Sequence, residues 1–335
     1  MSIERTVLFI AEFDDVSHAY SAQCQRALER LGAKVTAFDL AARPSLLQRF
    51  RAGDLVHRLE RVVDETDPEL VLVIGGDALD EALVDRLRAR VRARWINWLP
   101  HDLRSISSAI SLARPYDHLY ATGTDIAAEI GERLGRTVDV LAFAADPSVY
   151  RPIRTKDQYR ANVVFAGSAT PRRERLLGEL VEFGLAVWGP GWRKTGLRDY
   201  CRGEAPSTTA YVKAYAGATV AINIHHCAAE NSPHDASCNQ RLFELAAMGA
   251  AQVVDERGDL PRYFEAGNEV VVFQDGGDLR NRVRDLIENP GEAERLGQAA
   301  RLRALQEHTY MHRTRQLLLD QPRGPGYDRR ATDRG

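Results

Sequence analysis

The stretch ELVLVIGGDALDEALVDRLRARVRARWINWLP, residues 69–100, decides the fold of this chain. Residues 70–74 are a short apolar run, residues 80–93 carry apolar side chains at helical spacing, and residues 94–99 are a second apolar run. A strand, a helix and another strand in this order build a parallel sheet, because parallel strands need a crossover connection. The stretch therefore predicts an α/β fold.

The same alternation continues on both sides of this stretch. It predicts six strands in the first half of the chain, with helices between them. After a polar, proline-containing connector at 143–160, the alternation starts again and ends in a long helical region from Glu292 to about Leu319. The predicted strands are 6–13, 34–40, 69–76, 94–100, 118–123 and 138–144, then 161–168, 185–192, 219–226 and 269–275.

The length of 335 residues exceeds what one ordinary core supports and predicts two domains. We expect both to be doubly wound and Rossmann-like, and to face each other across a cleft, because open α/β sheets bind ligands at the carboxyl ends of their strands. The expected domains are 1–150 and 151–320. Residues 321–335 are polar and rich in Pro, Gly and Arg, which predicts a disordered tail.

Composition excludes several classes of protein. The formal net charge of -2 gives no overall basic field for nucleic acid or an anionic membrane. No apolar run approaches the length of a membrane span, and the N-terminus lacks the features of a signal peptide. The four cysteines show no CxxC pairing, as expected where thiols stay reduced, so the chain is predicted to be cytoplasmic.

Three common motifs are absent. The turn after the first predicted strand holds no GxGxxG, which disfavours a dinucleotide-binding dehydrogenase. The chain holds no GxxxxGK[ST] and no GxSxG, which disfavours a P-loop NTPase and a hydrolase with a nucleophile elbow.

A buried helix with two charged residues is predicted after residue 236. Ser237 and Gln240 fit a capping box at its start, and residues 242–248 are apolar except for Glu244. Arg241 and Glu244 lie one turn apart, and we expect both at the exposed N-terminal end of the helix, facing the cleft. The helix dipole and Arg241 would suit a pyrophosphate, and Glu244 could accept hydrogen bonds from ribose hydroxyls. The alternative is an ordinary Arg–Glu pair at a helix end.

A second helix start follows the strand at 161–168. Thr170 can cap this helix and Pro171 suits its first position, which places Arg172 and Arg173 in the first turn. Cations at this end oppose the helix dipole, so an anionic ligand or a nearby carboxylate must offset them. Glu174 and Glu179 are the nearby carboxylates, and a solvated charged face is the alternative to a phosphate site.

Histidines and cysteines gather between these two helix starts. Their spacing matches no standard zinc pattern, and adjacent His225 and His226 on a strand point to opposite faces. A polar loop at the cleft describes the segment better than a metal site. The residues concerned are His225, His226, Cys227, His234, Asp235 and Cys238.

In the first half, His101 and Asp102 follow a strand at the expected edge of the cleft. They could supply a general base or bind a hydroxylated acceptor, or they could belong to a helix-capping loop. Asp14, Asp15 and His18 could line the same cleft after the first strand.

Several segments together resemble the CgeB-like, spore-maturation-type glycosyltransferases of the GT-B superfamily. The similarity spans nearly the whole chain and is strongest from about residue 161 to 317. The run R-x-F-E, with the Ala/Gly-rich turn and Val-Val-Asp that follow it, is the most specific part. The segments are VVFAGSATPRRERLL (163–177), YAGATVAINIHH (215–226), NQRLFELAAMGAAQVVDERGDLPRYFEAGNEVVVF (239–273), EHTYMHRTRQLL (307–318), YDHLYATGTD (116–125) and AFAADPSVYRP (142–152).

The resemblance implies a two-domain GT-B enzyme that transfers a sugar from a nucleoside-diphosphate sugar donor, which is a substrate rather than a cofactor. Glu244 resembles the glutamate that holds the donor ribose, and Arg241 lies where the diphosphate is met. His101 and Asp102 fall where the first domain faces the acceptor, and they are the predicted catalytic residues. The implied donor-binding residues are Phe165, Gly167, Ser168, Arg172, Asp235, Ser237, Asn239, Arg241 and Glu244.

One departure from the family pattern leaves the stereochemistry of transfer open. Many retaining GT-B enzymes carry a second glutamate eight positions before the first, where this chain has Ala236, with Asp235 one place away. No DxD occurs at a plausible donor loop, and a GT-B enzyme needs no metal there, because cationic side chains and a helix dipole can stabilise the leaving diphosphate.

Two other functions compete with glycosyl transfer. A nucleotide-sugar epimerase shares the GT-B architecture and would turn over donor without an acceptor. A non-catalytic sugar-nucleotide-binding protein on a GT-B scaffold would bind donor without turnover. The acceptor is open as well: a glycan, a small molecule, a protein and a modified nucleic acid are all compatible with the sequence.

Overall fold

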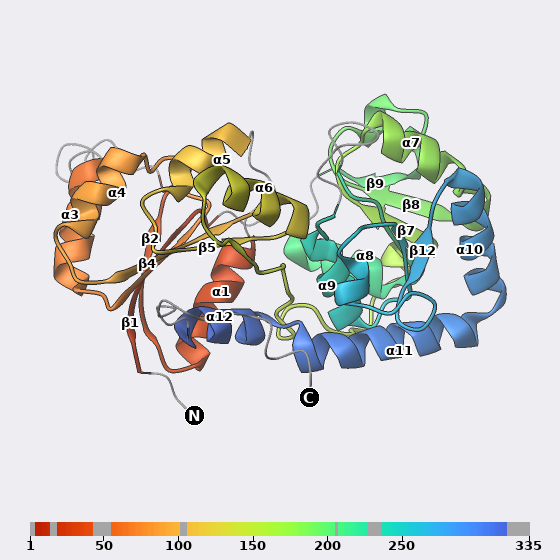
Figure 1. Ribbon diagram of the computed structural model, residues 1–335. Helices are drawn as coiled ribbons and strands as arrows, with labels where there is room; N and C mark the ends of the chain where they lie inside the picture. The colour runs from red at the N-terminus through yellow and green to blue at the C-terminus, as the bar shows by residue number, and fades with distance from the viewer. Residues whose placement is uncertain are drawn as a thin grey trace, which may run out of the picture.

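The computed structural model of the chain describes residues 4–13, 19–42, 55–100, 106–204, 207–226 and 236–319. The tail predicted at 321–335 lies outside these residues. The described residues form two units, each built around a parallel six-stranded sheet (Figure 1).

The first unit contains the sheet with strand order β2-β1-β3-β4-β5-β6, which is parallel throughout. The six strands predicted in the first half are confirmed, although β6 is only two residues long. The strands are β1 (Thr6–Ala11), β2 (Lys34–Asp39), β3 (Leu70–Ile74), β4 (Arg94–Leu99), β5 (His118–Ala121) and β6 (Asp139–Val140). The helices are α1 (Ala19–Arg30), α3 (Leu55–Thr66), α4 (Glu81–Arg88), α5 (Ile106–Ala113) and α6 (Thr124–Leu134).

The second unit contains the sheet with strand order β12-β11-β10-β7-β8-β9, also parallel. The strands are β7 (Ala161–Ala166), β8 (Leu185–Trp188), β9 (Cys201–Gly203), β10 (Ala218–Asn223), β11 (Gln252–Asp255) and β12 (Val271–Phe273). The helices are α7 (Pro171–Gly178), α8 (Thr208–Ala216), α9 (Gln240–Met248), α10 (Gly276–Glu288), α11 (Pro290–Glu307) and α12 (Tyr310–Leu319).

The strand order of the second sheet locates its ligand edge. Counted within the unit, the order is that of a Rossmann sheet, in which the strand order reverses between the first and fourth strands. Here these strands are β7 and β10, which pair directly. Because ligands of such sheets bind at the carboxyl ends of the strands beside this reversal, the residues after Ala166 and Asn223 lie where a ligand is expected.

The stretch at 69–100 folds as predicted, into β3, α4 and β4. Every residue of β3 is buried, as expected for a strand covered on both faces. The helix begins at Asp80, whose side chain accepts a hydrogen bond from Leu83 N at 2.8 Å. Local sequence and tertiary packing therefore agree at this unit.

Four elements differ from the sequence prediction. Strand β9, at the sheet edge, and strand β11 are not among the predicted strands. Helix α7 ends at Gly178 and gives way to a separate helical turn, Val181–Phe183. The long terminal helical region is two helices, because the chain leaves helical geometry at His308 and pairs Thr309 with Ala145 in a parallel bridge.

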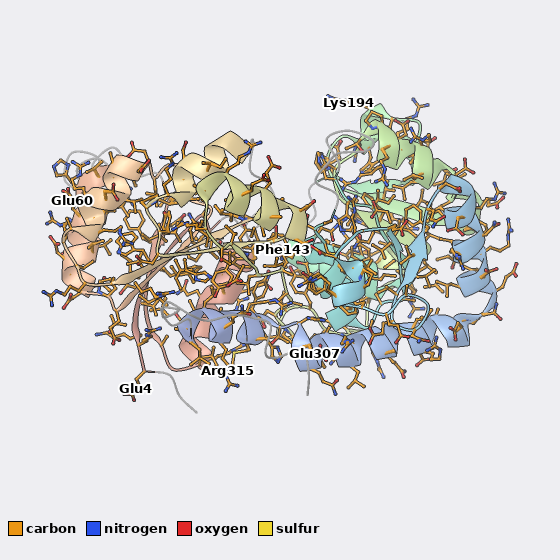
Figure 2. The ribbon with its side chains drawn as sticks, viewed as in Figure 1. Glu4, Glu60, Phe143, Lys194, Glu307 and Arg315 are labelled. Atoms are coloured by element: carbon orange, nitrogen blue, oxygen red, sulfur yellow. The ribbon has the colours of Figure 1, made fainter. Side chains whose placement is uncertain are left out.

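A shared core joins the two units. One buried cluster contains residues of β1 and α1 as well as residues of β7, β10 and α9. Phe143, in the connector between the sheets, belongs to this cluster and lies between the two units in Figure 2. It packs on Tyr20 and Trp98, with ring centroids 5.4 and 5.8 Å away.

The chain returns to the first unit at its end. Helix α11 lies along the second unit, and α12 continues from it to lie beside α1 (Figure 1). Arg313 of α12 donates from Nε to Ala142 O at 2.9 Å and from Nη2 to Phe143 O at 3.2 Å. Arg5, before β1, donates to Leu318 O at 2.5 Å. The units are thus connected by two passages of the chain that lie side by side.

Candidate functional site

The candidate site lies at the carboxyl ends of β7 and β10, where the strand order of the second sheet reverses. Gly167 and Ser168 follow β7, and Ile224 and His225 follow β10. Helix α9 starts beside them, because Asn239 at its N-cap exchanges two hydrogen bonds with Asn223: the Nδ2–Oδ1 distances are 2.8 and 3.2 Å.

Two arginine side chains pack on the Phe165 ring at this edge. The guanidinium carbons of Arg173 and Arg241 each lie 5.2 Å from the ring centroid. Arg173 is only 4% exposed, and it donates to Ser168 O at 3.0 Å and to Ile224 O at 2.8 Å. The Nε–H groups of both arginines are buried and have no hydrogen-bond partner among the described residues. Because buried donors without a partner are rare, the two arginines form a candidate anion-binding pair.

The surroundings of Arg173 do not neutralise its charge. Burial, and next the positive charge of Arg241, lower the pKa of Arg173 to about 10. The carboxylates considered as partners from the sequence are engaged elsewhere: Glu174 accepts from Gly196 N at 2.7 Å, and Glu179 lies 3.8 Å from an arginine of α10. The alternative of a solvated charged face is therefore wrong for Arg173.

Asp255, the last residue of β11, is the centre of a buried ionic network. Its carboxylate accepts from Arg172 Nη1 at 3.0 Å, from Arg257 Nη2 at 3.1 Å and from His225 Nδ1 at 2.6 Å. Although burial opposes ionisation, His225 and then the arginines hold the pKa of Asp255 well below its usual range. The carboxylate is ionised at neutral pH and fixes the position of Arg172.

His225 links this network to the start of α9. Its Nε2 accepts a hydrogen bond from Asn239 N at 2.9 Å, so Nδ1 carries the proton that is donated to Asp255. Burial lowers the pKa of His225, which favours this neutral form. Arg172 and Arg257 are therefore both paired with Asp255, whereas Arg241 lies within the electrostatic influence of Glu244.

Glu244 is buried, so its predicted exposed position at the helix end is wrong. It is 6% exposed, and its carboxylate accepts from Tyr211 Oη at 2.7 Å and from Gln240 Nε2 at 2.6 Å. Tyr150, from the connector, also hydrogen-bonds it. Burial raises the pKa of Glu244. The prediction that α9 is a buried helix is confirmed, since every residue from Leu242 to Met248 is buried.

The predicted capping box at Ser237 is wrong. Asn239 is the N-cap of α9, and its side chain accepts from Leu242 N at 3.0 Å. Asn239 occupies the N-cap position because His225 accepts a hydrogen bond from its N–H and Asn223 accepts one from its side-chain amide. These two partners are distant from Asn239 in the sequence. Ser237 is buried instead against Gly123 of the first unit. The cap predicted at Thr170 is confirmed: its side chain accepts from Arg173 N.

The structure brings together most of the predicted donor-side residues that it describes. Phe165, Gly167, Arg172, Asn239 and Arg241 surround the ends of β7 and β10, and a Cβ at Gly167 would lie 3.0 Å from Arg241 Nη2. Their role in binding a donor stays a prediction. The predicted residues outside the described part of the chain are His101, Asp102 and Asp235, together with Asp14, Asp15, His18, Cys227 and His234.

The sequence prediction considered Arg173 for a phosphate site without committing to it, placed His225 in a polar loop at the cleft, and missed Asp255. Helical spacing could have indicated that Arg173 is buried, because it lies three and four positions before the buried Leu176 and Leu177. His225 is buried and His226 exposed, as their alternation predicts. Nothing in the local sequence connects His225 with Asp255, which lies 30 residues further on.

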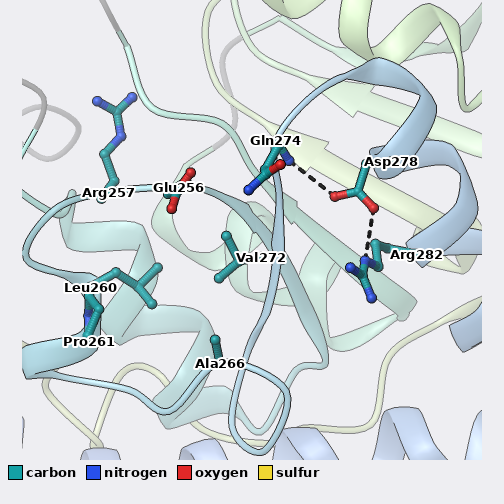
Figure 3. A pocket seen from close by; sticks show the side chains of 9 residues that line it. All are labelled: Glu256, Arg257, Leu260, Pro261, Ala266, Val272, Gln274, Asp278 and Arg282. Atoms are coloured by element: carbon teal, nitrogen blue, oxygen red, sulfur yellow. Dashed lines mark hydrogen bonds and ion pairs between the residues drawn. The ribbon is translucent and has the colours of Figure 1, made fainter.

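A separate hollow of about 390 Å³ opens beside β12 (Figure 3). Two of its charged groups are paired: Asp278 accepts from Arg282 Nε at 3.0 Å, and it also accepts from Gln274 N at 3.2 Å. None of the described donor-side residues lines it. Within the described ranges, no cluster of His, Cys, Asp and Glu could hold a metal ion, and no helix has the length and apolar composition of a membrane span.

The two units together define a class of fold. Sucrose-phosphate synthase from Thermosynechococcus elongatus is 13% identical, with a TM-score of 0.68 over 93% of this chain and 97% of that one. Anabaena HepE in complex with UDP and glucose is 14% identical, with a TM-score of 0.66 over 93% and 98%. A glycosyltransferase from Rickettsia africae is 9% identical, with a TM-score of 0.64 over 94% and 97%. The chain has the GT-B fold of two Rossmann-like domains, as the sequence resemblance implies.

A comparison with protein families gives a match within the second unit. Residues 172–319 match a family model described as glycosyl transferase-like. The match begins at Arg172 and includes α9, Asp255 and the terminal helices. No curated protein matches the chain by sequence.

Proposed function

We propose that the protein is a glycosyltransferase that moves a sugar from a nucleoside-diphosphate sugar to an acceptor. One observation carries the proposal: two arginines with unpartnered, buried Nε–H groups lie at the ligand edge of a Rossmann sheet. A diphosphate supplies the negative charge and the acceptor oxygens that these donors lack. The glycosyl transferase-like match over 172–319 and the UDP bound in the similar HepE structure support the same assignment.

The geometry suggests how the leaving group would be stabilised. In transfer, the bond between the sugar's anomeric carbon and the diphosphate oxygen breaks, while an acceptor oxygen bonds to that carbon and loses its proton. Arg173 and Arg241 are fixed by packing before any ligand arrives, so they can meet the developing diphosphate charge without reorganisation. In this proposal no metal ion is required. His101 and Asp102 remain our proposed groups for the acceptor side.

The finer features of the proposal follow the sequence resemblance. We assign the protein to the CgeB-like type, with a hexose or a related sugar as the transferred group. The donor-side set includes Ser168, Asp235, Ser237 and Glu244 besides the residues around Phe165. A cytoplasmic setting, expected from the cysteine usage, belongs to this proposal as well.

Nucleotide binding tests the proposal directly. Titration calorimetry with UDP, GDP, TDP, ADP, CMP and NAD should give a selective signal for one nucleoside diphosphate. In Arg241→Met the affinity for that ligand should fall about 10- to 100-fold, since a hydrogen bond to a charged group contributes about 1.5–3 kcal/mol. Arg61→Met, at an arginine of α3 with 60% of its side chain exposed, is the matched control and should bind normally.

Three results would overturn the proposal. One is the absence of binding by any nucleoside diphosphate while the protein is folded by circular dichroism. Another is turnover of the donor sugar to its epimer without any acceptor, which would make the protein an epimerase. Binding without turnover in a broad acceptor screen would leave a non-catalytic donor-binding protein.

A further inference from the structure

The N-terminus of α6 in the first unit receives its cap from the second unit. Gly123, the N-cap residue, has no side chain to satisfy the first N–H groups of the helix. Asp259, which follows β11, does so instead: its carboxylate accepts from Thr124 N at 2.8 Å and from Thr124 Oγ1 at 2.8 Å. Asp259 is 2% exposed, so its carboxylate is buried at this contact between the units.

A second pair of hydrogen bonds lies beside the first. Asp125 Oδ2, at the second position of α6, accepts from Ala236 N at 3.0 Å. Ala236 O accepts in turn from Asp259 N at 2.9 Å. Ala236 is therefore held on one side by the first unit and on the other by the residue that caps α6. Three residues further on, the chain reaches Asn239 and starts α9.

The approach of the two units at this contact requires a glycine. Gly123 has a backbone conformation that any residue can adopt, with φ at -132°. A Cβ added there would lie 2.7 Å from Ser237 Cβ and 3.2 Å from Ser237 Cα, closer than packed atoms come. A glycine is thus needed at position 123 because the two units pack closely there, and not because of its own backbone conformation.

We propose that these contacts form a latch that holds the two units closed and positions the segment leading into α9. The latch consists of Gly123, Thr124 and Asp125 on one unit and Ala236, Ser237 and Asp259 on the other. A carboxylate at the positive end of a helix is a favourable electrostatic contact, and here it exists only while the units are together. Opening would uncap α6 and release Ala236, so closure and the position of the helix carrying Arg241 are coupled.

The other connection between the units is suited to act as the hinge. The two passages of the chain meet in a single parallel bridge, Ala145 with Thr309, where Ala145 N donates to His308 O at 3.1 Å. Single extended segments change their backbone angles more easily than helices do. Because the contacts of the latch involve only residues of this chain, the latch can be tested without donor or acceptor.

Small-angle X-ray scattering of the full chain tests the latch. Asp259→Ala should increase the radius of gyration and the maximum dimension relative to the wild type, because the units separate more often. The matched control is Asp80→Ala, which removes the carboxylate that caps α4 within the first unit. It should lower the melting temperature and leave the scattering curve unchanged.

Two further variants keep the test decisive if Asp259→Ala folds poorly. Gly123→Ala should increase the radius of gyration, whereas Gly178→Ala, at a helical glycine with nothing within 4 Å of the added Cβ, should not. Thr124→Val should increase it in the wild type and have no further effect in Asp259→Ala. Scattering curves of Asp259→Ala and Gly123→Ala that both match the wild type would overturn the latch, whatever the nucleotide titrations give.

Discussion

His308, between α11 and α12, is a buried neutral histidine held at both ring nitrogens. Its Nε2–H donates to Tyr263 O at 2.9 Å, and its Nδ1 accepts from Arg313 Nη2 at 3.2 Å. Burial, and next the charge of Arg313, lower the pKa of His308 to about 4. Between about pH 4 and 6.5 the ring is therefore protonated in the unfolded chain and neutral in the folded protein.

This difference predicts a loss of stability in mild acid. The unfolded histidine takes up its proton near pH 6.5 and the folded one near pH 4, so the contribution of His308 is complete above 6.5 and is lost as the pH falls to 4. The loss is about 3 kcal/mol in all, with a slope approaching about 1.4 kcal/mol per pH unit. Urea unfolding of the wild type and of His308→Gln at several pH values from 7.5 to 4.5 would measure it.

The comparison isolates His308 from other groups. Glutamine can donate to Tyr263 and accept from Arg313, so the variant keeps both contacts and loses only the titration. The buried Glu244, whose raised pKa acts with the opposite sign, is present in both proteins. Equal slopes in wild type and variant would contradict the assignment.

The contacts of single residues explain why part of the site could not be predicted from the sequence. Ser237 and Asn239 are both good N-cap residues, and a periodic pattern does not choose between positions two apart. The choice is made by His225 and Asn223, which reach Asn239 through the fold. Arg172 and Arg173 are adjacent and identical, yet one pairs with Asp255 and the other packs on Phe165.

At the scale of elements, α9 and α11 make an unusually close contact. A Cβ at Gly297 would lie 2.2 Å from Gly249 O, at the C-cap of α9. Arg301, one turn along α11, donates to Ala247 O at 2.6 Å. The small residue on α11 thus allows this helix to hold the end of the helix that carries Arg241.

We expect Gly297→Ala to destabilise the protein, although alanine is the better helix former. The overlap forces the helices apart at a cost of about 1–3 kcal/mol, more than the gain of up to about 1 kcal/mol in helix propensity. Gly291→Ala, on the same helix with nothing within 4 Å, is the control and should be neutral or stabilising. Thermal unfolding of both would decide, and a variant at 297 as stable as the one at 291 would refute the packing argument.

Most elements were predictable because their signals are local. β3 and β4 are continuous apolar runs, and α4 is preceded by a capping aspartate. β9 was not, because its three residues, Cys201–Gly203, carry no apolar pattern and pair only at the sheet edge. The break at His308 was hidden for a similar reason: it is caused by pairing with Ala145, far away in the sequence.

At the scale of the whole molecule, Arg313 ties the end of the chain to the connector between the sheets. It donates to two main-chain oxygens of the connector, Ala142 O and Phe143 O, and also to Glu307 O; its guanidinium carbon lies 5.8 Å from the ring centroid of Phe243 in α9. Arg313→Met would leave the two connector carbonyl groups without this partner, at about 1–3 kcal/mol each. We expect a lower melting temperature and a broader transition in which the two units unfold less cooperatively.

Arg315→Met is the matched control for this prediction. Arg315 lies on the same helix, is exposed, and carries the same side chain (Figure 2). Its substitution should leave the calorimetric transition of the wild type unchanged. If Arg313→Met melts at the wild-type temperature in a single transition of the same width, the two units do not depend on this contact.

The return of α12 to the first unit has a consequence for biosynthesis. Leu317 and Leu318 of α12 share a core cluster with Val7 and Cys24, so the surface beside β1 and α1 stays uncovered until α12 leaves the ribosome. Between β6 and α12 the ribosome adds roughly 170 residues, which at about 5–20 residues per second takes about 10–30 s. All residues of the first sheet are therefore synthesised well before the residues of α12 that complete its core. During that interval the uncovered apolar surface is accessible to chaperones.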